Sequence, residues 1–290
     1  MLSLGHERAL CSLRFTPGGV IGMRLSCQEQ LLPGDSLEAK FDFARQAGFA
    51  GIELRGRGDG QFAARLPELR AAARAGVVMS TVCPEMDHFI GDFDADKRRD
   101  AVEQLRSQLS VIAELGGDGV LTPASWGMFS LRLPPFVPPR GPAEDRKVLL
   151  EALAVLGEHA AREGVWLAVE ALNRYEDYMV NRLEQAVSLG EEVERELKLD
   201  SVRVCADLYH MNIEEDDLAK AILDAGPWLA HVHVDDSNRL QPGTGHLDFA
   251  AVFDALRATG YDRWVTFECR LRGDPEEALP AATRFLASFL

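Results

Sequence analysis

Short apolar runs alternate along this chain with longer stretches in which apolar residues recur every three or four positions. The short runs are typical of buried strands in a parallel sheet, and the longer stretches predict amphipathic helices. The predicted strands are Val20–Ser26, Gly51–Leu54, Val77–Val82, Gly119–Thr122, Val165–Glu170, Val202–Asp207, Leu229–Val234 and Trp264–Glu268. The predicted helices are 36–47, 62–75, 94–116, 143–163, 182–197, 214–225, 248–259 and 274–288. Eight strands alternating with eight helices favour an α/β fold, a single-domain (β/α)8 TIM barrel, over an open doubly wound sheet.

Two segments fall outside this regular pattern. Residues 1–19 are interrupted by charges and by a Gly-Gly pair. They are interpreted as an N-terminal extension ahead of a barrel domain at 20–290, and the natural start could also be Met23. The Pro-rich stretch Pro123–Pro142 follows the fourth strand and carries Trp126. It also contains Phe129 and Phe136, and it is either a substrate-covering loop or a solvent-exposed insertion.

Composition and charge narrow the function classes. A net charge of −15 argues against a nucleic-acid partner, because binding to a phosphate backbone relies on basic surface. No apolar stretch is long enough to cross a bilayer, so no membrane partner is expected. The five cysteines are widely spaced and form no CxxC pair, as in a reduced cytoplasmic protein. No GxGxxG motif follows the first strand, which disfavours dinucleotide binding.

Acidic and histidine residues stand at the ends of the last four predicted strands. They are Glu170, Asp207, His233 and Glu268, in that order. Each alone is more often a helix cap, a surface charge or a buried structural histidine. In a parallel barrel, however, the carboxyl ends of the strands converge on one mouth, where active sites form. Three crowded carboxylates need a cation. One imidazole with three carboxylates suits one divalent ion, Mn²⁺ first, with Co²⁺, Mg²⁺ or Zn²⁺ also possible.

Four segments carry a resemblance to a known family. VEALNRYE, ADLYHMNIEE, HVHVDDSNRLQPGTGHLDF and TFEC resemble the sugar isomerase/epimerase family of xylose-isomerase-like barrels, nearest to the ketose 3-epimerases of the D-tagatose and D-psicose type. The resemblance covers the C-terminal half strongly, whereas the N-terminal half contributes GIEL (Gly51–Leu54) and the barrel pattern. The resemblance also implies a homodimer or homotetramer.

The resemblance implies roles for individual residues. Glu170, Asp207, His233 and Glu268 match the metal ligands, and Glu170 and Glu268 also match the catalytic acid/base pair. Three further residues match positions that hold the oxygens at the carbonyl end of the sugar, namely Glu176, His210 and Arg239.

These roles predict a metal-dependent isomerase or epimerase that moves a proton at the carbon next to a ketose carbonyl, through an enediolate. The segments after the third and fourth strands carry no obvious basic group for a phosphate, which favours an unphosphorylated sugar as the partner. An inosose or keto-sugar dehydratase on the same scaffold is the main alternative. A DNA-repair enzyme of the AP endonuclease type would need more histidines and a basic groove, and a non-catalytic sugar-binding barrel would not need two metal-bound glutamates.

Three weaker candidates complete the predicted site. Glu53 ends the second strand and either reaches the mouth or caps local structure. His88 follows the third strand and either lines the pocket or lies on an exposed loop, and Trp126 belongs to the Pro-rich stretch. The acidic run Glu214–Asp217 is expected to open a helix. The cysteines beside the proposed ligands, Cys205 and Cys269, are expected to be buried packing residues.

Overall fold

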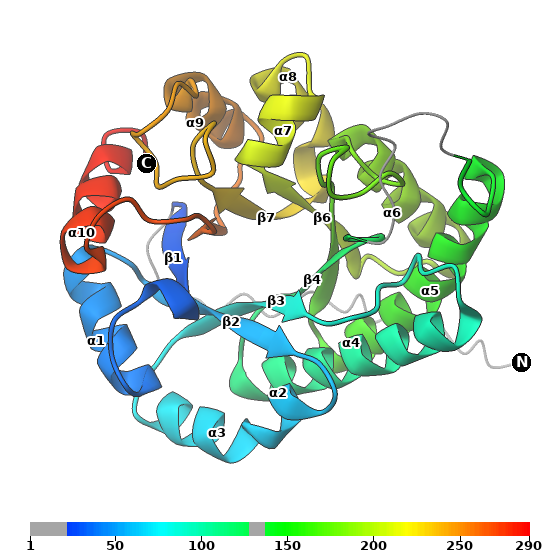
Figure 1. Ribbon diagram of the computed structural model, residues 1–290, viewed down its shortest axis with the longest axis horizontal. Coiled ribbons are helices and arrows are strands. Elements are labelled where there is room, and N and C mark those ends of the chain that lie inside the picture. Colours follow the sequence, from blue (N-terminus) through cyan, green and yellow to red (C-terminus); the bar gives the residue numbers. More distant parts are fainter. Residues whose placement is uncertain (1–21, 128–136) are drawn as a thin grey trace, which may run out of the picture.

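The computed structural model describes residues 22–127 and 137–290. Eight parallel strands form a closed barrel in which each strand pairs with its neighbours in sequence, and β1 pairs with β8 to close the ring (Figure 1). The strands are β1 (Arg24–Gln28), β2 (Gly51–Arg57), β3 (Met79–Glu85), β4 (Gly119–Pro123), β5 (Trp166–Glu170), β6 (Val202–Asp207), β7 (Leu229–Val234) and β8 (Trp264–Phe267). The predicted single-domain (β/α)8 barrel is therefore confirmed.

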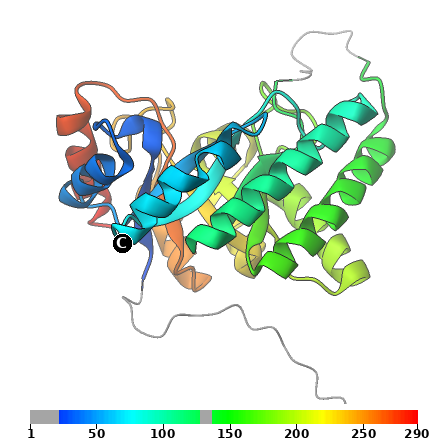
Figure 2. The same cartoon turned by 90° about the horizontal axis from the view of Figure 1, so that it is seen from below.

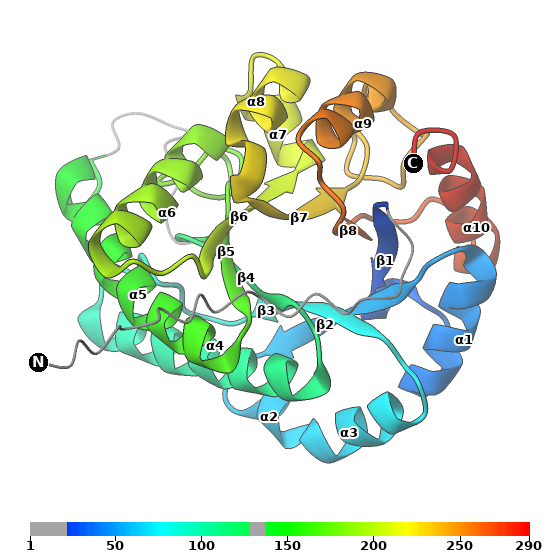
Figure 3. The ribbon, with the colours of Figure 1, turned by 180° about the vertical axis from the view of Figure 1, so that it is seen from behind.

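Helices surround the barrel on all sides, as the view from the opposite end also shows (Figure 3). They are α1 (Leu37–Ala47), α2 (Gln61–Ala64), α3 (Leu66–Arg74), α4 (Ala95–Leu115), α5 (Pro142–Glu163), α6 (Leu183–Leu197), α7 (Leu208–Glu214), α8 (Leu218–Ala225), α9 (Phe249–Ala258) and α10 (Pro275–Leu286). The two longest, α4 and α5, run side by side along the outer face (Figure 2). Within the described ranges, every helix is too short or too polar to cross a bilayer.

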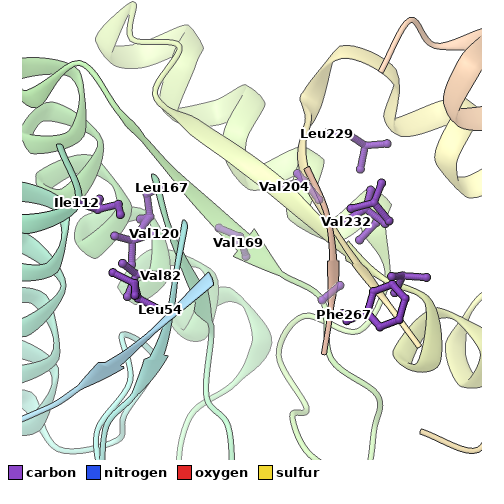
Figure 4. Close-up of a cluster of buried hydrophobic side chains, with 14 of the residues drawn as sticks. Leu54, Val82, Ile112, Val120, Leu167, Val169, Val204, Leu229, Val232 and Phe267 are labelled. Atoms are coloured by element: carbon purple, nitrogen blue, oxygen red, sulfur yellow. The ribbon is translucent and has the colours of Figure 1, made fainter. Parts of the chain in front are cut away.

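The core is divided into two parts by the alternation of side chains along each strand. Outward-facing apolar residues of the strands, such as Val82, Val120 and Leu167, are fully buried beside Ile112 of α4 (Figure 4). A separate small cluster contains Cys83, Leu121, Trp166, Ala168, Cys205 and Ala230. Trp166 and Ala168 share the inward face of β5 with Glu170, so this cluster closes the barrel interior below the carboxyl end of the strand.

Two predicted helices differ from those in the structure. The predicted helix 214–225 was wrong in its start, because the Asp207 carboxylate accepts a hydrogen bond from the His210 backbone N–H and starts α7 directly after β6. The acidic run does not open one helix: Glu214 ends α7, and Asp217 caps α8 through the Lys220 backbone N–H. The predicted helix 62–75 is split at Arg65 into α2 and α3.

Strand boundaries also differ from prediction. The first strand begins at Arg24; of the residues predicted before it, Gly22 and Met23 are not in a strand, and 20–21 lie outside the described residues. β2 and β3 extend three residues beyond their predicted ends and pair through Arg57 and Glu85. The predicted extension 1–19 and the aromatic residues Phe129 and Phe136 also lie outside the described residues.

Candidate metal centre and active site

The four residues predicted as metal ligands converge at the mouth of the barrel. Glu170 ends β5, Asp207 ends β6, His233 lies near the end of β7, and Glu268 follows β8. One donor atom from each lies within 4.8 Å of the donor atoms of the other three. His233 Nδ1 is 3.0 Å from Glu170 Oε1, 2.7 Å from Glu268 Oε2 and 3.9 Å from Asp207 Oδ2.

The three carboxylates of this cluster face only two basic side chains, His233 and Arg239. A single ring nitrogen of His233 faces three carboxylates, and it can carry only one proton. Glu268 Oε2 is buried and, although close to His233 Nδ1 and Arg239 Nη2, it is aligned for a hydrogen bond with neither. Burial raises the pKa of Glu170, which shows the cost of an ionised carboxylate at this position. Three carboxylate oxygens and one imidazole nitrogen are a suitable donor set for a divalent ion, so the residues fit such an ion.

The pKa values of the two glutamates shift in opposite directions. Burial would raise the pKa of Glu268, but His233 and Arg239 outweigh it and lower that pKa well below its usual value. Burial would lower the pKa of His233, but the carboxylates led by Glu268 raise it well above its usual value. The site thus holds one carboxylate that favours ionisation and another, Glu170, that favours a proton, an arrangement that suits acid/base chemistry.

Arg239 lies inside the same cluster. Its Nη1 is 2.7 Å from Asp207 Oδ2 and 3.2 Å from Asp235 Oδ2, and its Nη2 is 3.2 Å from Glu268 Oε2. The backbone of Arg239 has φ of 60°, an uncommon left-handed conformation. The loop around it is held by Asp236, whose Oδ2 accepts from the backbone N–H groups of residues 243 and 244.

His210 is buried at the start of α7 with a defined tautomer. The backbone N–H of Asn173 donates to His210 Nδ1 at 3.1 Å, so the ring proton is on Nε2. Nε2 lies 3.9 Å from Asp207 Oδ2 and 3.3 Å from Arg239 Nη1. Because both Nε2–H and Nη1–H are donors, the second contact is not a hydrogen bond. Nη1 already donates to Asp207, so the Nε2–H of His210 is the group that can donate to a further atom.

Glu176 and Trp126 lie together beside this cluster. Asn173 Nδ2 donates to Glu176 Oε1 at 3.0 Å, and Trp126 Nε1 donates to Glu176 Oε2 at 3.2 Å. Trp126 is half exposed. It also lines a cavity of about 400 Å³ together with Met86, Asp92, Phe93 and Lys97. The cavity is thus linked through Glu176 and Asn173 to His210.

The other two weaker candidates, Glu53 and His88, lie in different surroundings. Glu53 is fully buried on β2 and contacts His231 and His233, so it does not cap a helix. His88 is half-buried after β3, and its Nδ1 has no hydrogen-bond partner among the described residues. His88 does not belong to the groups of possible ligands that include His233.

Sequence reasoning missed three residues of the site. Cys83 donates its thiol hydrogen to Glu268 Oε1 at 3.7 Å, and burial raises the pKa of this thiol. Asp235 is buried beside Arg239 and accepts from the Tyr209 backbone N–H. Asn173 orients both His210 and Glu176. The Asp-Asp pair that begins two residues after His233 could have indicated Asp235. Nothing in the sequence indicated Cys83 beyond its position near a strand end.

The chain belongs to the xylose isomerase-like TIM barrel family, whose model matches residues 41–289. A 3-dehydro-D-guloside 4-epimerase of Escherichia coli strain K12 is 41% identical over 258 residues, covering 88% of this chain and 96% of that protein. An L-ribulose 3-epimerase of Mesorhizobium japonicum is 34% identical over 194 residues, covering 67% and 61% of the two chains. Both of these relatives are sugar epimerases, and the match to the 4-epimerase extends over more of the chain.

Solved structures agree with this assignment. The crystal structure of a 3-keto-D-glucoside 4-epimerase from E. coli has a TM-score of 0.83 at 38% identity, covering 92% of this chain and 99% of the other. The structure of an L-ribulose 3-epimerase has a TM-score of 0.77 at 26% identity, covering 92% and 94%.

Proposed function

We propose that this protein is a metal-dependent epimerase that inverts the carbon next to a ketone in an unphosphorylated sugar, with keto-glycosides as its preferred substrates. The observation that carries the proposal is the convergence of Glu170 and Glu268 on His233 Nδ1, with Arg239 and His210 beside them. The preference for a keto-glycoside over a free ketose rests on the long match to the 4-epimerase.

A divalent ion held by Glu170, Asp207, His233 and Glu268 would act as a Lewis acid that stabilises negative charge on the sugar oxygens. We propose Mn²⁺ for this role because the donor set combines hard carboxylate oxygens with one imidazole nitrogen. The environment of Arg239 supports the preference for an unphosphorylated sugar. Its guanidinium already contacts three carboxylates, so its charge is not available to bind a phosphate.

The two glutamates would move the proton. One carboxylate removes the proton from the carbon next to the ketone, and the C–H electron pair becomes the double bond of an enediolate. The second, as a carboxylic acid, returns a proton to the opposite face, and the double bond reverts to the ketone. No oxidant is needed and atoms balance, because one proton leaves and one enters. Glu170 and Glu268 approach His233 from β5 and from the end of β8, on different sides of the mouth.

Arg239 and His210 would stabilise the charge that develops on the sugar oxygens. The His210 tautomer leaves Nε2–H available, and Arg239 adds a fixed positive charge at the same place. Donors held in position before the reaction are the most effective way to stabilise such an oxyanion. Glu176, held by Asn173 and Trp126, would accept a hydrogen bond from a sugar hydroxyl.

Incubation in D₂O with Mn²⁺ tests the proposal. A methyl 3-keto-hexoside should gain deuterium at the carbon next to the ketone, with inverted configuration by NMR, faster than D-fructose gains it at C3. Glu268→Gln should lower turnover by about 10²–10⁴-fold. The matched control Glu192→Gln, which alters a carboxylate paired with Arg146 outside the barrel, should retain turnover. A dehydrated product would favour the lyase, and absence of exchange on every sugar would refute the proposal.

We also propose a homodimer or homotetramer, an expectation that follows from the family resemblance. Sedimentation velocity at micromolar concentration tests it, and a single species at the monomer mass of 31.9 kDa would contradict it.

A further inference from the structure

Glu53 is a fully buried carboxylate that none of the proposed reaction steps uses. It lies on β2, on the opposite side of the barrel from β6, and its side chain reaches the two histidines of β7. Its Oε1 is 3.0 Å from His233 Nε2 and also accepts from Gln28 Nε2 at 3.0 Å. Its Oε2 accepts from the Thr81 hydroxyl at 2.6 Å and is 3.0 Å from His231 Nε2. A buried carboxylate with four polar neighbours has a fixed orientation.

The two nitrogens of the His233 ring therefore face different partners. Nδ1 faces the carboxylates of Glu170, Asp207 and Glu268, and Nε2 faces Glu53. Neutral imidazole carries its proton on one nitrogen and a lone pair on the other. The nitrogen that offers a lone pair to a cation at the carboxylate cluster is Nδ1, so the proton must be on Nε2. Glu53 Oε1 is placed to accept that proton in a hydrogen bond.

We propose that Glu53 is the positioning residue of the metal centre. It selects the Nε2–H tautomer of His233, fixes the plane of the ring and makes Nδ1 a stronger ligand. The inference rests on the proposed metal-dependent function. Glu53 does not touch the sugar in this role; it acts through His233. Outer partners of this kind typically change metal affinity by about 10–100-fold when they are removed.

A second ion held by Glu53, His231 and His233 is a competing interpretation, because their donor atoms are close enough together. The contacts of Glu53 disfavour it. Gln28 and Thr81 already donate to its two oxygens, and the Gln28 amide is oriented by a hydrogen bond from Gln30. His233 would also have to lose both ring protons to bind two ions at once. His231 Nε2, although close to Glu53, is not aligned for a hydrogen bond.

Two measurements test the positioning role, and the first uses the unaltered protein. With ¹⁵N-labelled histidine and Zn²⁺ as a diamagnetic ion, His233 should show a protonated Nε2 and a metal-shifted Nδ1. The signal is assigned by its loss in His233→Gln. A His233 ring protonated on Nδ1, or an ion bound at Nε2, would overturn the inference whether or not any Glu53 variant folds.

The second measurement compares metal affinity by competition with a chelator. Glu53→Gln, which keeps size but removes charge, should bind Mn²⁺ about 10–100-fold more weakly. Thr81→Val, which removes one donor to Glu53, should weaken binding less and serves if Glu53→Gln does not fold. Glu29→Gln is the matched control, because Glu29 is also a buried carboxylate in an ion pair, with Arg65, but is not a predicted ligand. It should change Mn²⁺ affinity less than twofold.

The outcomes separate this inference from the proposed function. Tight binding of one ion by the unaltered protein and equally tight binding by Glu53→Gln would overturn the positioning role alone. Two ions per chain, falling to one in Glu53→Gln, would replace it with a second metal site. No bound ion in the unaltered protein would overturn the proposed function, and the inference with it.

Discussion

Arg239 Nη1 lies 2.7 Å from Asp207 Oδ2, at the centre of the side chains that converge on the mouth of the barrel. The contact places one permanent positive charge among three carboxylates. It compensates Asp207 directly and Glu268 in part, through Nη2 at 3.2 Å. Glu170 has no such contact with Arg239, and its pKa is raised by burial. The guanidinium thus makes the two glutamates chemically unequal before any cation binds.

Arg239→Lys should lower turnover by about 10²–10³-fold, the usual cost of removing one donor from an oxyanion site. Lysine keeps the charge but loses the planar fork that reaches Asp207 and Glu268 together. Steady-state kinetics with a keto-glycoside measures the effect. Arg146→Lys is the control, because Arg146 contacts Glu192 on the outer helices. Equal turnover in both variants would show that the fork is not used in the reaction.

The convergence of the four proposed ligands was predictable because it follows from two simple rules. Side chains alternate along a strand, and parallel strands of a barrel share one carboxyl end. Inward-facing residues at the carboxyl ends of β5, β6 and β7 are therefore expected to meet. Glu170, Asp207 and His233 satisfy both rules, and Glu268 follows β8 directly. The local sequence carried this information in full.

Other parts of the site depend on contacts that no local pattern encodes. Glu53 reaches His233 across the barrel over a sequence separation of 180 residues, so its partner appears only when the ring closes. Arg239 enters the cluster through a left-handed backbone conformation, which a sequence pattern does not reveal at an arginine. The early start of α7 arises because Asp207 both points into the site and caps a helix. The sequence pattern indicated Asp207 only as a proposed ligand and did not indicate that it also caps α7.

Metal removal should destabilise the protein. Without a cation, the carboxylates of Glu170, Asp207 and Glu268 repel one another in a buried site. An ion at a hundred times its dissociation constant stabilises the folded state by about 2.7 kcal/mol. For a domain of this size, that corresponds to a rise in Tm of roughly 4–5 °C. Thermal unfolding with Mn²⁺ and with excess chelator measures the difference, and Glu268→Gln should show a smaller one. Identical Tm values would argue against a bound ion.

Asn173→Leu should reduce kcat/KM by about 10–100-fold. The substitution preserves volume but removes the amide that donates to Glu176 Oε1 and contacts His210. Leaving buried polar partners unsatisfied costs about 1–3 kcal/mol. Metal affinity should remain unchanged, because Asn173 does not contact the proposed ligands directly. Chelator competition beside steady-state kinetics separates the two effects. Weaker Mn²⁺ binding in Asn173→Leu would mean that the loop supports the metal centre and not the sugar.

Glu29 and Arg65 give a pH dependence of stability that is independent of the metal centre. Arg65 donates to both carboxylate oxygens of Glu29, at 2.7 and 2.9 Å, and the Arg55 backbone N–H donates at 2.7 Å. Burial would raise the pKa of Glu29, but these hydrogen bonds and the charge of Arg65 lower that pKa below its ordinary value of 4.5. The folded state therefore binds this proton more weakly than the unfolded chain does.

It follows that this contribution to stability is fully present above pH 4.5 and is lost as the pH falls through the lowered pKa of Glu29. Glu29→Gln should reduce the free energy of unfolding by about 1.5–3 kcal/mol at pH 7, the range for hydrogen bonds to a charged group. The difference from the unaltered protein should shrink as the pH falls below 4.5, because the unaltered carboxylate then also becomes neutral. Urea unfolding between pH 7 and pH 3.5 measures both values, with chelator present to remove any metal contribution. A difference that stays constant over this range would mean that Glu29 stabilises the barrel through packing and not through its charge.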